Sequence, residues 1–143
     1  MRVYLDNCVF NRPFDDQNQT RIRLETEAIL SIRENIVRDE IELVWSYVID
    51  FESVRNPFPL RRNAAESWKE LSIIEIAPSI EIVSEAIEFR DIGFRKVDSL
   101  HIACAVASNS RYFITTDDAI LKKSGLVKGI SLTGPIEFLE MKG

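Results

Sequence analysis

The fold is decided by the stretch Val3-Tyr4-Leu5-Asp6-Asn7-Cys8. Its β-branched, aromatic and aliphatic residues stand in succession, which predicts a short buried strand that ends at Asp6. Ligands of open α/β sheets bind at the carboxyl ends of the strands, so Asp6 is a candidate site residue. An Asp at this point also commonly caps a turn or the next helix, and the stretch by itself leaves both interpretations open.

Size and composition indicate one globular domain over residues 1–143, because 45% of the residues are hydrophobic and 29% are charged. We expect no targeting or membrane segment, since every apolar run is far shorter than a bilayer span. Cys8 and Cys104 lack Cys-x-x-Cys spacing, which argues against zinc or a disulfide framework and favours a cytoplasmic protein. The net charge of −5 argues against an overall basic surface but permits a local basic patch.

Strand-like and helix-like segments alternate along the chain, which predicts an α/β fold with a mainly parallel sheet and helices on both faces. The expected strands are residues 3–5, 41–46, 112–114 and 127–132, with 75–78 as a short strand or an extended connector. The expected helices are residues 20–38, 47–55, 60–74, 79–90, 97–108, 119–123 and 135–140, and residues 11–19 are expected to form a loop.

Two of the predicted helices have apolar stripes that we assign to the core. The stripe of the first consists of Ile22, Leu24, Ala28, Ile29, Ile32 and Ile36. The stripe of the helix over 79–90 consists of Ile80, Val83, Ala86 or Ile87, and Arg90, after an N-cap at Ser79 and before a C-terminal cap at Gly93.

Carboxylates follow two strands and open two helices. Asp6 and Asp117 stand at strand ends, whereas Glu52 and Asp98 stand near helix starts. Neighbouring parallel strands bring these positions to one edge of the sheet. Two carboxylates about 5 Å apart repel by roughly 3 kcal/mol at an effective dielectric near 20, so such a cluster needs a cation or protonation. Oxygen ligands without a His or Cys cluster favour Mg²⁺ or Mn²⁺.

Other acids are weaker candidates. Asp50 lies near Glu52, but helical spacing points the two in different directions, so only one is expected to face the site. Asp118 is a second choice beside Asp117. Asp15 and Asp16 lie in the predicted loop, where an Asp most often serves a turn or a helix cap.

The order of these motifs resembles the PIN-domain ribonucleases, in particular the toxins of VapBC toxin–antitoxin pairs. The matching segments are Tyr4-Leu5-Asp6-Asn7, Val48-Ile-Asp50-Phe-Glu52, Asp98-Ser-Leu-His101-Ile-Ala-Cys-Ala105 and Ile114-Thr115-Thr116-Asp117. The resemblance implies a PIN-like three-layer α/β/α sandwich. It also implies hydrolysis of RNA phosphodiester bonds that depends on Mg²⁺ or Mn²⁺, held by Asp6, Glu52, Asp98 and Asp117. A cognate antitoxin and a homodimer are implied as partners.

The chain departs from the family pattern at two places. Asn7 and Cys8 follow Asp6 where relatives often have hydroxyl residues, and Asp117-Asp118-Ala119-Ile120 replaces an Asp-x-Asp-Phe ending. Asn7, Thr115 and Thr116 are therefore expected to hydrogen-bond the ligand carboxylates or the attacking water.

Further polar residues have two possible roles each. His101 lies in an apolar helix, and we favour a structural role over a catalytic one. Four arginines surround the expected mouth of the site, where they either bind RNA phosphates or simply cover helix surfaces: Arg12, Arg55, Arg61 and Arg62.

Four alternative functions differ from this one, and one of them is a structural or interaction domain that merely happens to carry these acids. A haloacid-dehalogenase-type phosphatase needs a second Asp two residues after the first, and Cys8 occupies that position. A catalytically silent PIN-like binding module would keep the fold without the chemistry. A PIN nuclease that processes RNA without an antitoxin would keep the chemistry but not the partner.

Overall fold

The computed structural model describes residues 1–142 and contains a five-stranded sheet in the order β3-β2-β1-β4-β5. All four pairings between neighbouring strands are parallel. The strands are β1 (Arg2–Leu5), β2 (Glu42–Ser46), β3 (Ile74–Ile76), β4 (Tyr112–Ile114) and β5 (Ser131–Thr133). The predicted mainly parallel α/β fold is confirmed.

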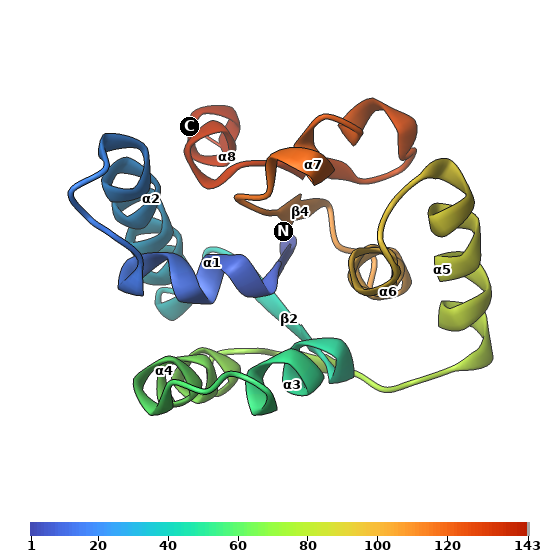
Figure 1. The fold of residues 1–143 in the computed structure, drawn as a ribbon, viewed down its shortest axis with the longest axis horizontal. Helices are drawn as coiled ribbons and strands as arrows, with labels where there is room; N and C mark the ends of the chain where they lie inside the picture. Colours follow the sequence, from blue (N-terminus) through green and yellow to red (C-terminus); the bar gives the residue numbers. More distant parts are fainter. Residues whose placement is uncertain (143) are drawn as a thin grey trace.

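Helices cover both faces of this sheet. The α-helices are α1 (Asn7–Asn11), α2 (Thr20–Val37), α3 (Tyr47–Val54), α4 (Pro59–Lys69), α5 (Ile80–Ile92), α6 (Lys96–Ala107), α7 (Asp118–Leu121) and α8 (Pro135–Lys142). Two 3₁₀ turns, Arg12–Phe14 and Ser124–Leu126, complete the described elements. In Figure 1, α2, α4 and α8 lie on one side of the strands and α6 lies on the other, with α5 outside it. These are the layers of an α/β/α sandwich.

The strand β1 runs through the middle of the core, and its residues alternate between the two faces. Val3, Tyr4 and Leu5 are fully buried. On one face the ring of Phe10 from α1 packs between Trp45 of β2 and Trp68 of α4. On the other face Tyr4 stacks on Phe113 and contacts His101 of α6.

The register of the three central strands brings their carboxyl ends to one edge. Tyr4 pairs with Val44 and Leu5 pairs with Ile114, so β1, β2 and β4 end close together. The residues that follow these strands are Asp6, Tyr47 and Thr115, each leading into the next segment of the site.

Several predicted boundaries differ from those of the structure. The loop expected over 11–19 begins as the tail of α1, which starts directly after Asp6, and continues as a 3₁₀ turn. The helix expected over 60–74 ends at Lys69, because Ile74 already belongs to β3. The last strand is shorter and later than 127–132, and covers Ser131–Thr133.

Two predicted core faces were partly wrong. In α2 Leu24 is 45% exposed, and the carboxylate residue Glu25 is buried in its place. In α5 the residues Ile80, Val83 and Ile87 are exposed, whereas Ile82, Ala86 and Phe89 are buried. The helix α5 is apolar on several sides, so periodicity could not select the face that packs against α6. The predicted caps of α5 are confirmed at Ser79 and at Gly93, whose φ of +124° suits glycine.

Within residues 1–142, every helix is too short or too polar to cross a membrane.

Candidate functional site

Asp6 lies at the end of β1 and is only 6% exposed. Its backbone N–H donates to the carbonyl of Ile114, which fixes the strand end. Its Oδ1 accepts from the Asn7 backbone N–H at 2.8 Å and caps α1, and its Oδ2 accepts from the Thr115 hydroxyl at 2.8 Å. Asp6 is therefore both a helix cap and a site residue, so the two interpretations open from sequence are compatible.

Glu52 and Asp50 point to different environments, as their helical spacing predicts. Ser46 caps α3 by accepting from the Ile49 N–H, which starts the helix immediately after β2. Asp50 turns away and accepts from Trp45 Nε1 at 2.9 Å, and it also pairs with Lys69. Glu52 instead contacts Nε2 of His101.

Asp117 and Asp98 lie at the same edge but outside the group of close ligand atoms formed by Asp6, Glu52 and His101, and both approach Arg95, at 4.0 and 3.9 Å. Asp117 caps α7 by accepting from the Ala119 N–H at 2.8 Å, and its own N–H donates to the Thr115 hydroxyl at 3.0 Å. Asp98 lies in the first turn of α6. Burial, followed by repulsion from Asp6 and Asp117, raises the pKa of Asp98 to about 6.

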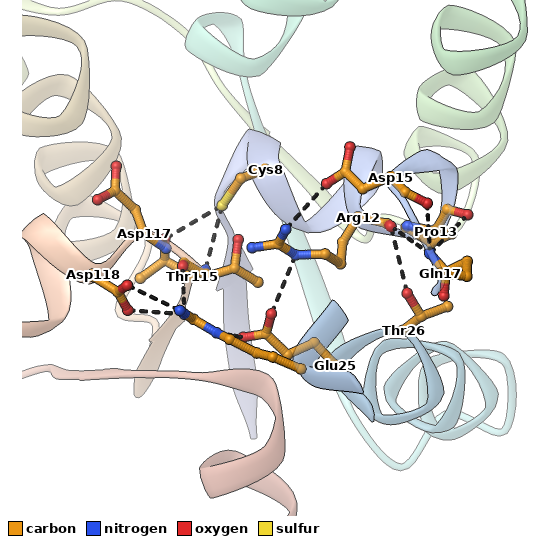
Figure 2. A network of polar contacts seen from close by, with 12 residues as sticks. Cys8, Arg12, Pro13, Asp15, Gln17, Glu25, Thr26, Thr115, Asp117 and Asp118 are labelled. Atoms are coloured by element: carbon orange, nitrogen blue, oxygen red, sulfur yellow. Dashed lines mark hydrogen bonds and ion pairs between the residues drawn. The ribbon is translucent and has the colours of Figure 1, made fainter. Parts of the chain in front are cut away.

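Asp118 takes no part in this cluster. Arg21 binds its two carboxylate oxygens at 2.8 and 2.9 Å, and this hydrogen bonding lowers the pKa of Asp118. Figure 2 shows the Asp118 carboxylate turned toward these contacts, while the carboxylate of Asp117 points elsewhere. The structure thus places these two neighbouring acids in different surroundings.

The two loop acids serve local structure. Asp15 forms ion pairs with Arg12 and Arg61, both at 3.2 Å. Asp16 accepts from the backbone N–H of Asn18 in an exposed turn. Neither lies with Asp6, which agrees with the turn interpretation.

Cys8 occupies the space beside Asp6 for which sequence reasoning proposed Asn7. The thiol Sγ lies 3.5 Å from Asp6 Oδ2 and 3.4 Å from the Thr115 hydroxyl, and it accepts from the Thr116 N–H at 3.4 Å. Asn7 contributes its backbone N–H to Asp6, and its side chain lines a neighbouring cleft. Burial raises the pKa of the Cys8 thiol to about 12, so the thiol stays neutral and can donate to a carboxylate.

His101 lies beneath the carboxylates, and its side chain is fully buried. Its Nδ1 is 2.6 Å from the Tyr4 hydroxyl, and its Nε2 contacts Glu52 and lies 3.7 Å from Asp6 Oδ1. Burial opposes protonation, but the hydrogen bond to Glu52 and the charges of Asp6 and Glu52 outweigh it, so the pKa of His101 is raised. The burial of His101 agrees with the structural role favoured from the sequence, and its contacts with Tyr4 and Glu52 arise only in the folded chain.

The donor set fits a divalent cation. One ligand atom each from Asp6, Glu52 and His101 lies within 4.8 Å of the others. Asp98 is close enough to Asp6 and Asp117 for their charges to hinder its ionisation. A bound cation would relieve this repulsion, and carboxylate oxygens are the ligands that Mg²⁺ and Mn²⁺ prefer.

A cleft of about 390 Å³ adjoins Glu52 and is lined by Asn7, Asn11, Phe51, Glu52, Arg55, Asn56, Pro57, Phe58, Arg61 and Val97. Two of the four arginines singled out from the sequence, Arg55 and Arg61, therefore reach it. Arg12 instead lies between the carboxylates of Asp15 and Glu25, as Figure 2 shows. Arg62 donates to the carbonyl of Asn56.

The protein is a parallel α/β sandwich with carboxylates at the carboxyl edge of its sheet, which is where α/β proteins bind their ligands. The model of the PIN domain family matches residues 3–126, and the chain belongs to that family, whose members are nucleases.

The fold also resembles a chain in the crystal structure of VapBC2 from Rickettsia felis bound to a DNA fragment from their promoter. The TM-score is 0.59 and the identity is 12%, over 94% of this chain and 98% of that chain. A search of curated proteins gave no match.

Proposed function

We propose that this protein is an endoribonuclease that depends on Mg²⁺ or Mn²⁺ and acts as the toxin of a type II toxin–antitoxin pair. The observation that carries the proposal is the meeting of Asp6, Glu52 and His101, whose ligand atoms lie within 4.8 Å of one another, in a family of nucleases. The pKa of Asp98, raised first by burial and then by the charges of Asp6 and Asp117, fits a cluster of acids at this place. Such a cluster is costly without a cation and suited to phosphodiester chemistry with one.

Asp6, Glu52, Asp98 and Asp117 would hold the cation. When bound, the cation supplies Lewis-acid activation of an attacking water and neutralises charge on the phosphate. Thr115 holds two of these acids in place, since its hydroxyl donates to Asp6 and accepts from the Asp117 N–H. The Thr116 N–H donates to the Cys8 thiol, which lies beside the Asp6 carboxylate.

The cleft beside Glu52 offers a path for the substrate. Arg55 and Arg61 line this cleft and would meet phosphates there, although Arg61 also pairs with Asp15. The exposed ring of Phe58 provides a surface on which a base can stack. The net charge of −5 makes this local placement of arginines the main electrostatic attraction for RNA.

A toxin role rests on the fold shared with a chain of the VapBC2 complex. We infer a cognate antitoxin as the partner and a homodimer as the assembly. A small upstream reading frame with a DNA-binding pattern would support the pairing. Growth arrest on expression, relieved by Asp6→Asn, is the expected biological effect, and its absence would favour a nuclease without an antitoxin.

The biochemical test is cleavage of a labelled single-stranded RNA with Mn²⁺, Mg²⁺ or EDTA. We expect cleavage with the cations, none with EDTA, and none in the folded variants Asp6→Asn and Asp98→Asn. Asp91→Asn is the matched control, because Asp91 is exposed on α5. Full activity of Asp6→Asn would refute the site. A wild-type protein that binds RNA but never cleaves it would indicate a silent binding module instead.

A further inference from the structure

A buried chain of polar groups leads from the core to Glu52. The Tyr4 hydroxyl lies 2.5 Å from Ser46 Oγ and 2.6 Å from His101 Nδ1, and His101 Nε2 contacts Glu52. Tyr4, Ser46 and His101 have no exposed surface. The three residues come from β1, the end of β2 and the middle of α6, so these contacts join the sheet to α6.

The donor and the acceptor of the contact between His101 and Glu52 can be assigned. An ionised carboxylate only accepts, so Nε2 of His101 must carry the proton that it shares with Glu52. At the other end Tyr4 can serve either protonation state of Nδ1, as acceptor from Nδ1–H or as donor to bare nitrogen. Ser46 complements either arrangement because a hydroxyl both donates and accepts.

We propose that Tyr4 and His101 are positioning residues, which hold the Glu52 carboxylate in the orientation that binds the divalent cation. This inference rests on the proposed function. It assigns His101 a role through Glu52, because Nε2 is already engaged by that carboxylate and lies 3.7 Å from Asp6. Glu52 needs such support, since its side chain is 30% exposed on a helix of eight residues.

The core around Tyr4 is built to hold this geometry. The Tyr4 ring is parallel to Phe113 at a centroid distance of 5.5 Å and meets the His101 ring edge-on at 5.6 Å. These contacts leave the phenol little freedom to rotate away. Hydrogen bonds that orient metal-binding carboxylates from behind typically change metal affinity by about 10–100-fold when removed.

The test measures Mn²⁺ binding, by the loss of the free-ion signal in electron paramagnetic resonance, on the complete chain. We expect Tyr4→Phe to weaken Mn²⁺ binding by about 10-fold or more, because it leaves His101 without its partner. Tyr112→Phe is the matched control: Tyr112 lies on the adjacent strand, and its ring packs on Phe138. High Mn²⁺ should restore RNA cleavage by Tyr4→Phe, which a general loss of structure would not allow.

A second pair of variants keeps the proposal testable if Tyr4→Phe fails to fold. His101→Leu fills the space with an apolar side chain and should lose about 10–100-fold in Mn²⁺ affinity, whereas His101→Gln keeps an N–H donor and should recover much of it. Equal affinity of Tyr4→Phe and Tyr112→Phe, or of His101→Leu and wild type, would overturn the proposal. So would ¹⁴N coupling to bound Mn²⁺, because His101 would then be a direct ligand.

Asp6→Asn separates this inference from the proposed function. If Asp6→Asn loses Mn²⁺ binding while Tyr4→Phe and His101→Leu keep it, only the positioning role is wrong. If Asp6→Asn also binds Mn²⁺ normally, the proposed metal site itself is wrong.

Discussion

The Thr115 hydroxyl donates a hydrogen bond of 2.8 Å to the carboxylate of Asp6, which precedes it by 109 residues. The same oxygen accepts from the Asp117 N–H at 3.0 Å. One fully buried side chain thus connects the ends of β1 and β4 and fixes two acids relative to each other.

Thr115→Val should therefore weaken Mn²⁺ binding by about 10-fold or more while the protein remains folded, because valine keeps the shape but removes the hydroxyl. Thr133→Val is the matched control. Thr133 is buried on the adjacent strand β5, and its hydroxyl makes only a 3.4 Å contact to Gly134. Titration calorimetry with Mn²⁺ would measure the difference, and equal affinities would show that Thr115 is only a core residue.

The pKa of Asp98, about 6 in the folded chain against an ordinary value of 3.8, predicts a stability that depends on pH. The folded state binds more protons than the unfolded state between about pH 4 and 6, so the free energy of unfolding of metal-free protein falls as pH rises through this range. A pKa shift of about two units corresponds to about 2–3 kcal/mol in the free energy of unfolding, and this contribution is fully lost above about pH 7.

Denaturant unfolding in EDTA at pH 5 and pH 7.5 measures this effect. Asp98→Asn should remove the part of the dependence that comes from Asp98 and be the more stable protein at pH 7.5, while the part that comes from His101, whose pKa is also raised, should remain. Mn²⁺ added at pH 7.5 should restore stability to the wild type. A wild-type protein that becomes more stable with rising pH in EDTA would contradict the prediction.

The two thiols should resist alkylation in the native protein. Burial raises the pKa of both Cys8 and Cys104 to about 12, so little reactive thiolate exists at pH 8. Iodoacetamide labelling followed by mass spectrometry should show slow modification of both cysteines in buffer and rapid modification in denaturant. Rapid native labelling of Cys8 would mean that its contact with Asp6 is frequently broken.

Glu25 should contribute strongly to stability because it is buried between two arginines. Its carboxylate lies 3.2 Å from Arg12 and 3.5 Å from Arg21, and it is 5% exposed. Glu25→Gln leaves both cations without this partner, and we expect a loss of about 3 kcal/mol in the free energy of unfolding. Glu27→Gln changes an exposed acid of the same helix and should have little effect. Chemical denaturation of both variants makes the comparison.

Arg55 should contribute to RNA affinity through phosphate contact. It lines the cleft beside Glu52 and stacks on Phe51 at 3.7 Å. Arg55→Ala should weaken binding of a non-cleaved RNA similarly for all sequences and reduce the salt slope by about 1. Arg38→Ala, at the end of α2, is the control. Fluorescence anisotropy at several salt concentrations would decide, and an unchanged slope would remove Arg55 from the RNA path.

Much of the architecture follows from local sequence. The apolar run Val3-Tyr4-Leu5 forms a central strand because its β-branched, aromatic and aliphatic side chains favour extended backbone and are buried between two neighbouring strands. The segments predicted as helices over 47–55 and 97–108 form α3 and α6 with boundaries within one residue. Ser46 caps α3, whereas no side chain among residues 1–142 caps α6. Strand ends then placed Asp6 and Asp117 at one edge, as parallel pairing requires.

Tertiary structure decided which face of a helix is buried where the apolar residues of the sequence allow more than one. Contact with α6 buries Phe89 and leaves Ile80 in solvent, although the sequence of α5 allows either face. Ion pairs with Arg12 and Arg21 stabilise the buried carboxylate of Glu25, and a pattern of hydrophobic residues cannot predict such a contact.

The same distinction applies within the candidate site. The sequence by itself determined that Asp6 and Asp117 follow strands and that Asp98 opens a helix, because those positions depend on short-range propensity and on the parallel order of the elements. Glu52, expected near a helix start, instead lies in the second half of α3. Only tertiary structure decided that Cys8 lies beside Asp6, that Arg21 binds the Asp118 carboxylate, and that His101 connects Tyr4 to Glu52. Most of these contacts join residues that are distant in sequence. They form only when the helices pack on the sheet, because packing sets the direction in which each side chain points.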